Sequence, residues 1–408
     1  MEILYPCCAG LDVHKDLVVA CAREVVGASV RHDTAEFATT TRGLLTLADW
    51  LKQHRCTHVA MEATGVYWKP VWHVLEGSFE QLLVNPAHAR NVPGRKSDVN
   101  DAHWLADLLA HGLIRPSFVP PARIQELRDL TRTRKQLVRQ VGRHTQRIQK
   151  TLEDANLKLT GVISDLLGTS GRAILKALIA GETDPERLLE HTTGRLEAPR
   201  ERLLEGLRGV VTDHHRFMLR LHLRQIESLE AGIAQLERQI ERLLRPFRER
   251  VERLATIPGV SDTVAQVLVA EIGLDMARFP TSGHLVSWAG LCPRMDESAG
   301  KRRSTRVRHG APWLKTTLVT AAWAAASSRD TYLRAQFQRL KTRRGPKKAV
   351  VAVAASILTA AYFILRDGVD YRELGTGYFD HRDRARVLRR LSRRIEALGY
   401  RVEVHRVA

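Results

Sequence analysis

The sequence predicts an α/β region at the N-terminus followed by a longer, mostly helical part. Three short runs rich in Val, Ala and Cys lie between Cys7 and about Val30, and tight turns between such runs are typical of an antiparallel β-meander. Helical and strand-like segments then alternate, which indicates a layered α/β fold with its functional residues at strand ends. Beyond about residue 120, long helical patterns replace this alternation.

The remaining elements of the α/β region, which we place at 1–120, follow from apolar spacing. In chain order they are a helix at Thr41–His54, a strand at Thr57–Met61 that ends at Glu62, a helix at Tyr67–Leu75, a strand at Gln81–Val84, a loop at Asn85–Lys96, and a helix at Ala102–Leu113.

The chain is strongly basic. Its 408 residues include 64 Lys and Arg against 45 Asp and Glu, a formal net charge of +19. A cationic globular protein of this kind most often binds nucleic acid, although a membrane surface or solubility alone also fits. Aromatic residues make up only 6% of the chain, so we expect phosphate contacts to outweigh base stacking.

The cysteines and the apolar segments predict a soluble, cytoplasmic protein. None of the five cysteines has the spacing of a zinc site or of a disulfide pair, which suits a reducing cytosol. The segment Ala349–Leu365 is 17 residues long, alanine-rich and interrupted by Ser356 and Thr359. We therefore expect a buried helix there and no membrane as a partner.

A predicted arm at 121–250 begins with a long polar helix at Arg123–Asn156. Between Arg128 and Lys150, eight residues are Lys or Arg and one is acidic, so this helix is predicted to follow a phosphate backbone, with a solvated basic face as the alternative. The residues expected to bind nucleic acid here are Arg128, Arg132, Lys135, Arg139, Arg143 and Arg147.

The second half of the arm carries a heptad repeat. Leu219, Ile226, Ile233 and Ile240 recur every seven residues, and Leu229, Leu236 and Leu243 fall between them. This spacing is typical of a coiled-coil seam. It fits equally well an internal hairpin with the preceding basic helix and a dimer.

A third region is predicted at 251–370, followed by a basic tail at 371–408. The turn at Thr256–Val260 resembles half of a helix-hairpin-helix unit, and alanine-rich helices are expected at Trp313–Ser327 and Lys347–Leu365. The tail is predicted to form a basic helix and a strand at Tyr400–His405, and it either contacts nucleic acid or only solubilises the chain. A loop at Arg294–Gly310, before the first of the alanine-rich helices, contains Ser298 and the cations Lys301, Arg302, Arg303 and Arg306, which we expect to contact nucleic acid.

Four carboxylates in the N-terminal region are candidates for metal binding. Asp98 and Asp101 stand three residues apart at the start of a predicted helix and therefore share one face, although capping alone would also favour them there. Asp12 and Glu62 lie in apolar runs, where a carboxylate is costly unless it is paired or metal-bound. Together the four could hold two Mg²⁺ or Mn²⁺ ions against a phosphodiester.

Several short motifs resemble those of the DEDD transposases of bacterial insertion sequences, a family that includes pilin-gene invertases and bridge-RNA-guided recombinases. The resemblance covers roughly residues 8–115 and 254–368. The motifs are Gly10-Leu11-Asp12-Val13-His14-Lys15, Glu62-Ala63-Thr64-Gly65, Lys96-Ser97-Asp98 with Asp101-Ala102, Ile257-Pro258-Gly259, and Gly290-Leu291-Cys292-Pro293 with Ser298-Ala299-Gly300-Lys301.

This resemblance implies a RuvC-like, RNase H-type N-terminal domain with Asp12, Glu62, Asp98 and Asp101 as its acidic tetrad, a helical coiled-coil arm and a C-terminal transposase domain. It also implies that Ser298 attacks DNA and becomes covalently joined to it, within a homo-oligomer (a dimer or a tetramer) that brings the serine of one subunit to the acidic site of another. RNA-guided members take their sequence choice from a structured RNA. The glycine that commonly follows the serine is Ala299 here.

The residues alone leave other functions open. A serine in a Gly- and Arg-rich loop is ordinarily a turn residue, and Ser304 is a rival nucleophile in the same loop. A metal-dependent nuclease of the junction-resolving kind would need the carboxylates but no serine. A non-catalytic coiled-coil protein that binds nucleic acid would need neither.

Overall fold

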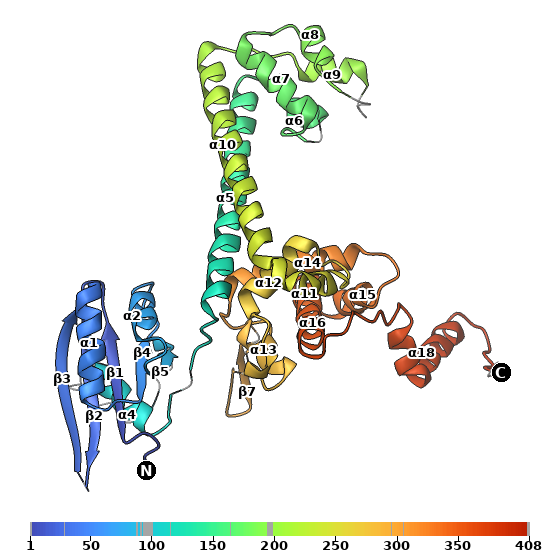
Figure 1. Cartoon of the computed structure of the whole chain (residues 1–408). Coiled ribbons are helices and arrows are strands. Elements are labelled where there is room, and N and C mark those ends of the chain that lie inside the picture. Colours follow the sequence, from blue (N-terminus) through green and yellow to red (C-terminus); the bar gives the residue numbers. More distant parts are fainter. Residues whose placement is uncertain are drawn as a thin grey trace. The chain divides into compact units, whose positions relative to one another are not determined.

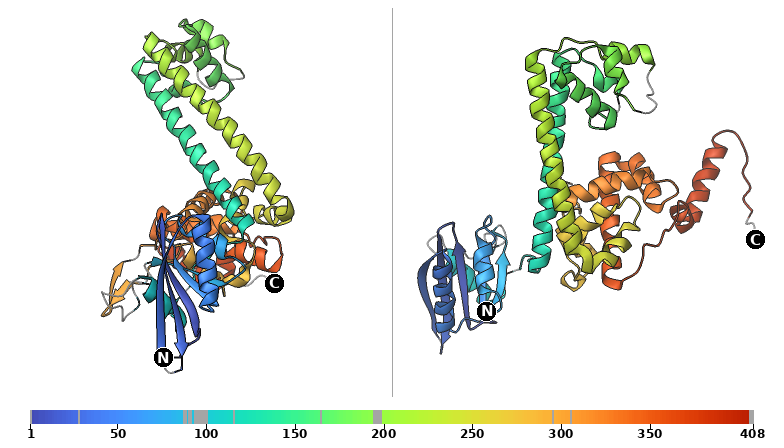
Figure 2. Two further views of the ribbon diagram at one scale, coloured as in Figure 1. Left: turned by 60° about the vertical axis from the view of Figure 1, so that its left-hand side comes forward. Right: turned by 45° about the horizontal axis from the view of Figure 1, so that its top comes forward.

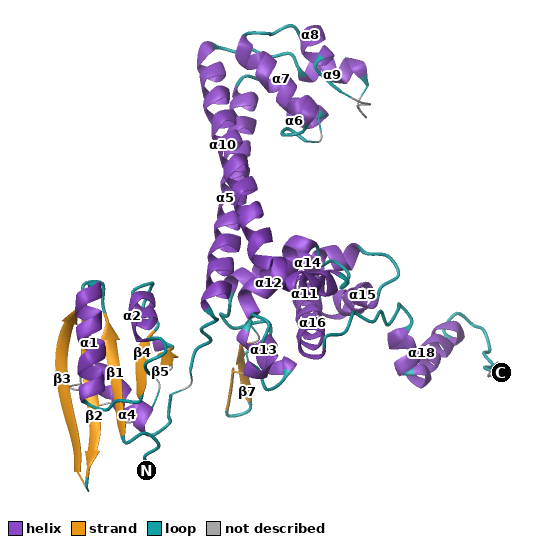
Figure 3. Ribbon diagram, in the orientation of Figure 1, coloured by secondary structure: helices purple, strands orange, loops and turns teal. Residues whose placement is uncertain are grey.

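The computed structural model describes residues 2–27, 29–86, 89, 92, 101–114, 116–163, 165–193, 199–294, 296–304 and 306–405. The chain divides into two compact units, Met1–Pro120 and Pro121–Ala408. Figures 1 and 3 show that the first unit contains a sheet flanked by helices and that helices dominate the second. This agrees with the predicted α/β N-terminus and helical remainder.

The sheet of the first unit has five strands in the order β3-β2-β1-β4-β5. The first three strands pair antiparallel, as the meander predicted, whereas β4 and β5 run parallel to β1. The strands are β1 (Cys7–Val13), β2 (Leu17–Val26), β3 (Ser29–Ala38), β4 (His58–Glu62) and β5 (Glu80–Val84), and the helices are α1 (Thr41–Gln53), α2 (Trp68–Leu75) and α4 (Asp101–Ala110).

Helices cover both faces of this sheet, because successive side chains of a strand point to opposite sides. Ala9, Leu11 and Val13 pack with residues of α1 and α2 in one core. Cys8 packs on the other face with residues of α4. Each strand of the centre is therefore buried on two sides, and a carboxylate in it needs a specific reason.

The second unit begins with two long helices that pair antiparallel, α5 (Ala122–Asp154) and α10 (Asp213–Leu244). The start of α5 and the end of α10 pack in one hydrophobic core. The end of α5 and the start of α10 pack in another. Figure 2 shows the pair from two further sides. The heptad repeat of α10 thus contributes to an internal hairpin, and dimerisation through it stays a prediction.

A small helical cap lies at one end of this hairpin and a larger helical domain at the other. The cap contains α6 (Leu159–Val162), α7 (Thr169–Ala180), α8 (Pro185–Glu190) and α9 (Arg200–Gly206). The helices of the larger domain are α11 (Arg248–Ala255), α12 (Asp262–Ile272), α13 (Ser282–Trp288), α14 (Pro312–Ser327), α15 (Tyr332–Arg344) and α16 (Pro346–Asp367). The domain also contains the 3₁₀ turns Arg245–Phe247 and Met276–Arg278 and a hairpin of β6 (Asp296–Ser298) and β7 (Lys301–Ser304). Two further helices follow it, α17 (Tyr378–Arg382) and α18 (Arg384–Glu396).

Helix α16 is long and apolar enough to cross a bilayer by composition. Val353, Ala354 and Ile357 on it are nevertheless fully buried in the core of the helical domain. The small side chains of α14 and α16 allow these helices to pack closely, as the alanine-rich pattern predicted. The buried helix expected at this place is confirmed.

One local prediction differs from the structure, and the setting of another is now visible. Residues 400–405 form no strand. The Pro-Gly turn packs inside the helical domain, because Gly259 has φ +83 and a Cβ there would lie 2.4 Å from the carbonyl oxygen of Ala321 on α14. Ile257 and Val260 beside it are also buried. The turn therefore joins α11 to α12, as the turn of a helix-hairpin-helix unit does, and phosphate binding by it stays a prediction.

Candidate active site

Asp12 and Glu62 lie next to each other on one face of the sheet. Strands β1 and β4 are parallel neighbours, and Gly10 stands opposite Ala60 in their register. Asp12 and Glu62 each follow two residues later, so both return to the face of Gly10 and Ala60 at the carboxyl ends of the two strands. Asp12 is 19% exposed and Glu62 9%.

Helix α4 covers this face and begins close to both carboxylates. Its Ala106 carbonyl accepts a hydrogen bond from the Cys8 thiol at 3.5 Å. A Cβ on Gly10 would lie 2.1 Å from the carbonyl oxygen of Ala102, so β1 touches the backbone of α4 where only glycine fits. Ala106 of α4 lies beside Cys8 of β1, and Ala102, about one turn earlier in α4, lies beside Gly10. The N-terminus of α4 therefore points along β1 toward Asp12.

Asp101, the first residue of α4, is thereby placed at the same edge as Asp12 and Glu62. Asp98, the fourth predicted carboxylate, lies outside the described residues. His14 Nε2 is 3.2 Å from Asp12 Oδ2, and His14 is exposed enough to turn away. Oxygen donors gathered at a partly buried edge fit the ligand preference of Mg²⁺ or Mn²⁺.

A second titratable cluster on the same face was not predicted. Asp107 of α4 accepts a hydrogen bond from Arg23 Nε at 2.9 Å and lies 3.2 Å from His32 Nε2. His103 Nδ1 is 3.3 Å from its second oxygen, and the two histidine rings stack with centroids 3.7 Å apart. Burial first, and then the neighbouring His32, lower the pKa of His103.

One ligand atom each of His32, His103 and Asp107 lies within 4.8 Å of the other two, close enough for the three to share a metal ion. Arg23, however, is 3% exposed and places its fixed positive charge on the shared carboxylate, which opposes a divalent cation. We therefore interpret the cluster as a network that fastens α4 to β2 and β3. The i, i+4 spacing of His103 and Asp107 was its only signal in the sequence, because both strand partners lie far away in the chain.

The basic helix α5 uses its first cations inside the protein. Arg128 donates to the carbonyl oxygens of Ala270 and Glu271 at the end of α12, at 3.1 and 2.7 Å. Arg132 donates two hydrogen bonds to the Glu271 carboxylate at 2.7 and 2.8 Å, and Lys135 donates to Thr317 at 3.1 Å. These three side chains hold helices together, in contrast to the predicted phosphate contacts. Burial accordingly lowers the pKa of Arg128 and of Lys135.

Arg132→Ala should therefore destabilise the helical unit. Glu271 is 1% exposed, and the substitution leaves its carboxylate without the two-bond partner, with Arg128 Nε still 3.8 Å away. Breaking a buried ion pair in this way costs about 3 kcal/mol. Urea unfolding followed by tryptophan fluorescence measures the loss.

The matched control is Arg134→Ala. Arg134 lies two residues after Arg132 on α5, and the substitution removes its ion pair with the half-exposed Glu237 of α10. Exposed pairs contribute up to about 1 kcal/mol, so this variant should unfold near the wild-type midpoint. Equal midpoint shifts in the two variants would contradict a stabilising role for the Glu271 pair.

The later cations of α5 are exposed. Arg139 lies with its guanidinium carbon 5.5 Å from the ring centroid of Trp313, and Arg143 and Arg147 are exposed on the same helix. Neither the Arg143 nor the Arg147 guanidinium forms a hydrogen bond or an ion pair with another described residue. Nucleic-acid binding by these three exposed residues stays a prediction.

The serine loop folds as a two-residue hairpin. Ser298 pairs with Lys301, and the turn between them has positive φ at both positions, +50 at Ala299 and +73 at Gly300. A turn of this kind favours glycine at both positions, because a Cβ is strained there. Ser304 Oγ accepts a hydrogen bond from the Arg306 N–H at 3.2 Å. Lys301 and Arg306 are exposed, whereas the side chains of Ser298, Arg302 and Arg303 lie outside the described part of the chain.

Two family profiles match the chain and together cover more than half of it. A DEDD transposase profile of the IS110 type matches residues 9–157, which include all four predicted carboxylates. A profile described as the transposase IS116/IS110/IS902 family matches residues 251–338, which include Ser298.

Similar proteins extend over most of the chain. A "Probable family 20 transposase" of Pseudomonas aeruginosa is 27% identical over 369 residues, covering 89% of this chain and 94% of that protein. A "Pilin gene-inverting protein" of Moraxella bovis is 24% identical over 376 residues, covering 88% and 95%. With the profiles, they show that this chain belongs to the IS116/IS110/IS902 family of DEDD transposases and is a DNA-processing enzyme.

Proposed function

We propose that the protein cuts and rejoins DNA through a covalent link to Ser298, assisted by divalent ions at Asp12, Glu62, Asp98 and Asp101. The observation that carries this proposal is the placement of Asp12 and Glu62 on one face at neighbouring strand ends, with the start of α4 beside them. The strand order, with three antiparallel strands followed by two parallel ones, supports a RuvC-like, RNase H-type domain.

In this mechanism the Ser298 hydroxyl attacks a phosphodiester phosphorus. A Ser–O–P bond forms, one P–O bond to the sugar breaks, and the proton of the serine leaves with the sugar oxygen. Attack by a strand hydroxyl on the phosphoserine then reverses these changes and rejoins the DNA. One ester replaces another at each step, so no external energy source is required. Mg²⁺ or Mn²⁺ at the carboxylates would stabilise the entering and leaving oxygens.

The remaining residues would bind and orient the substrate. Exposed cations of the serine loop, such as Lys301 and Arg306, would neutralise the phosphate, whose charge grows in the transition state. Arg139, Arg143 and Arg147 of α5 would contact DNA or a structured guide RNA through phosphates. The acidic residues and Ser298 belong to different units of the chain, and we propose that a homo-oligomer brings them together from separate subunits.

A junction-resolving nuclease is the second candidate. It is favoured by one observation, namely that the carboxylates lie within a single unit and could form a metal site without any contribution from the serine hairpin. Such an enzyme would leave free DNA ends and no bond to protein.

One experiment separates these functions. Purified full-length protein is incubated with end-labelled DNA that carries the ends of its element, with Mg²⁺ and with RNA transcribed from the element, and the products are resolved on a denaturing gel. The proposal predicts labelled DNA that migrates with the protein, disappears after protease treatment and is absent in EDTA. Cleaved free ends without such an adduct would support the nuclease, and intact DNA in every lane would contradict both.

A further inference from the structure

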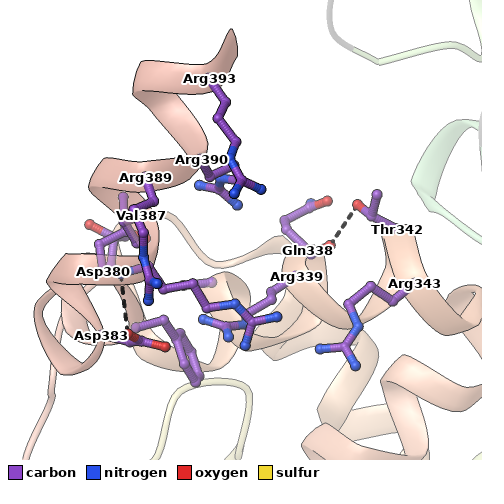
Figure 4. A pocket seen from close by; sticks show the side chains of 14 residues that line it. Gln338, Arg339, Thr342, Arg343, Asp380, Asp383, Val387, Arg389, Arg390 and Arg393 are labelled. Atoms are coloured by element: carbon purple, nitrogen blue, oxygen red, sulfur yellow. Dashed lines mark hydrogen bonds between the residues drawn. The ribbon is translucent and has the colours of Figure 1, made fainter.

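Helix α15, at the end of the second matched region, and helices α17 and α18 beyond it form a groove rich in arginine. A cavity of about 960 Å³ lies between α15 on one side and α17 and α18 on the other. Its described lining includes six arginines, Arg339 and Arg343 from α15 and Arg386, Arg389, Arg390 and Arg393 from α18. Figure 4 shows arginines of both helices around this space.

The arginines form two stripes that face each other. On α18 they stand at positions i, i+3, i+4 and i+7, which is one face of a helix, and on α15 they stand at i and i+4. Leu388, Leu391 and Ile395 lie on the opposite side of α18 and are 45%, 46% and 41% exposed. The cationic face of α18 is thus directed to the groove, and its apolar face is directed away.

The floor of the groove is held by specific contacts. Phe379 of α17 stacks on Tyr332 of α15 with ring centroids 5.1 Å apart, and the Arg339 guanidinium carbon lies 5.2 Å from the Phe379 centroid. The Glu373 carboxylate accepts hydrogen bonds from the backbone N–H groups of Tyr332 and Gly375 at 2.6 and 2.8 Å. These contacts attach the start of the tail to α15.

The charge of the groove is only partly compensated by the protein. Asp380 and Asp383 are the acidic residues of the described lining, and Asp383 also caps α18 by accepting from the Arg386 N–H at 3.3 Å. Two carboxylates face six guanidinium groups, and like charges brought together are unfavourable unless an anion comes between them. The groove therefore fits a polyanion.

We propose that this groove binds the phosphate backbone of duplex DNA without regard to sequence. The exposed arginines of α18 supply charge-assisted donors that match phosphate oxygens. The aromatic residue of the described lining, Phe379, is already engaged by Tyr332 and Arg339, so base stacking of a single strand is disfavoured. The choice of DNA among polyanions rests on the transposase family of the chain, and not on the chemistry proposed for Ser298.

The test measures binding of the full-length protein to a fluorescein-labelled, 30-base-pair duplex of mixed sequence by anisotropy, in EDTA so that no strand is cut. Arg389→Gln with Arg393→Gln removes two groove cations. Each lost phosphate contact lowers the slope of log K against log salt by about 0.9, so we expect the double variant to lower it by about 1.8 and to weaken binding on the order of tenfold at 0.15 M salt.

The matched control is Arg384→Gln with Arg394→Gln, which removes two cations from the same helix but outside the groove lining. It should change affinity less than about twofold, since exposed charges that do not contact a phosphate directly contribute little at this ionic strength. Arg389→Lys with Arg393→Lys keeps both charges and should restore the slope. Equal losses of DNA affinity in the groove and control variants would overturn the proposal, because they would show that the overall positive charge of the helix binds DNA and that the groove is not a specific site.

Two further outcomes separate other occupants. Phenylglyoxal modification followed by mass spectrometry should show that the duplex protects Arg389, Arg390 and Arg393 but leaves Arg384 and Arg394 reactive. Vesicles of phosphatidylserine and phosphatidylcholine provide the comparison. Loss of vesicle binding with unchanged duplex binding in the groove variant would assign α18 to a membrane surface and exclude DNA. Every binding measurement is made without metal, so that no DNA is cut. A negative result would therefore overturn the groove proposal without bearing on the proposed DNA cleavage and rejoining.

Discussion

Asp12→Asn should reduce DNA strand cleavage by about a thousandfold or more while leaving DNA binding intact. The substitution keeps the shape of the side chain and removes the negative charge that would hold a divalent ion beside Glu62 at the strand ends. Metal-assisted phosphoryl transfer takes several kcal/mol of transition-state stabilisation from such an ion, and each 1.36 kcal/mol corresponds to about a factor of ten in rate. Duplex binding should be unchanged or slightly tighter, because one repulsive carboxylate is gone.

The measurement is single-turnover cleavage of end-labelled DNA with Mg²⁺, with anisotropy binding recorded in parallel. Asp16→Asn is the control, since Asp16 is an exposed carboxylate in the turn that follows β1. It should cleave at the wild-type rate. Normal cleavage by Asp12→Asn, with a well-folded protein, would remove the acidic edge of the sheet from the mechanism.

The sequence predicted this edge because its signals are local. A carboxylate at the end of an apolar strand stands out in any chain, and the two-residue period of a strand decides which face it occupies. Parallel pairing of β1 with β4 could not be read from either strand alone. The close contact of Gly10 with α4 could not be predicted from the sequence either, because a glycine in a strand can mark a bulge, a bend or a close backbone approach.

The sequence could not show which cations of α5 have partners inside the protein, because those partners lie far away in the chain. Arg128 and Arg132 have the composition and spacing of a phosphate-binding stripe, yet their hydrogen-bond partner Glu271 lies about 140 residues later. The end of α12 engages both of these cations, Arg128 through backbone carbonyl oxygens and Arg132 through the buried Glu271 carboxylate. The heptads of α10 were equally ambiguous, because an apolar stripe does not specify whether its partner is α5 or a second copy.

The serine hairpin shows a third case, in which the backbone explains a residue that the sequence left open. Ala299 stands where the family resemblance predicts glycine, and its φ of +50 places a Cβ in a strained region. The hairpin nevertheless closes, with Gly300 carrying the second positive φ. The departure from the family pattern thus alters the strain of the turn and leaves its geometry in place.

Ser298→Ala should abolish the covalent protein–DNA adduct, whereas Ser304→Ala should retain it. The adduct requires the oxygen of the attacking residue, so its removal leaves no bond to form. Ser304 Oγ accepts a hydrogen bond from the Arg306 N–H, which gives this hydroxyl a local role in the turn after β7. Losing one such hydrogen bond costs about 1 kcal/mol, enough to lower the adduct yield a few-fold and no more.

Both variants are compared on the denaturing gel with DNA, RNA and Mg²⁺, and mass spectrometry of the protease-treated adduct identifies the modified peptide. Ser298 and Ser304 lie on opposite strands of one hairpin, so each serves as the other's control for folding of the loop. If Ser304→Ala loses the adduct and Ser298→Ala keeps it, the nucleophile lies on β7. If both variants keep it, the DNA is joined to a different residue, and the acidic edge must act with a nucleophile that neither the sequence nor the hairpin identifies.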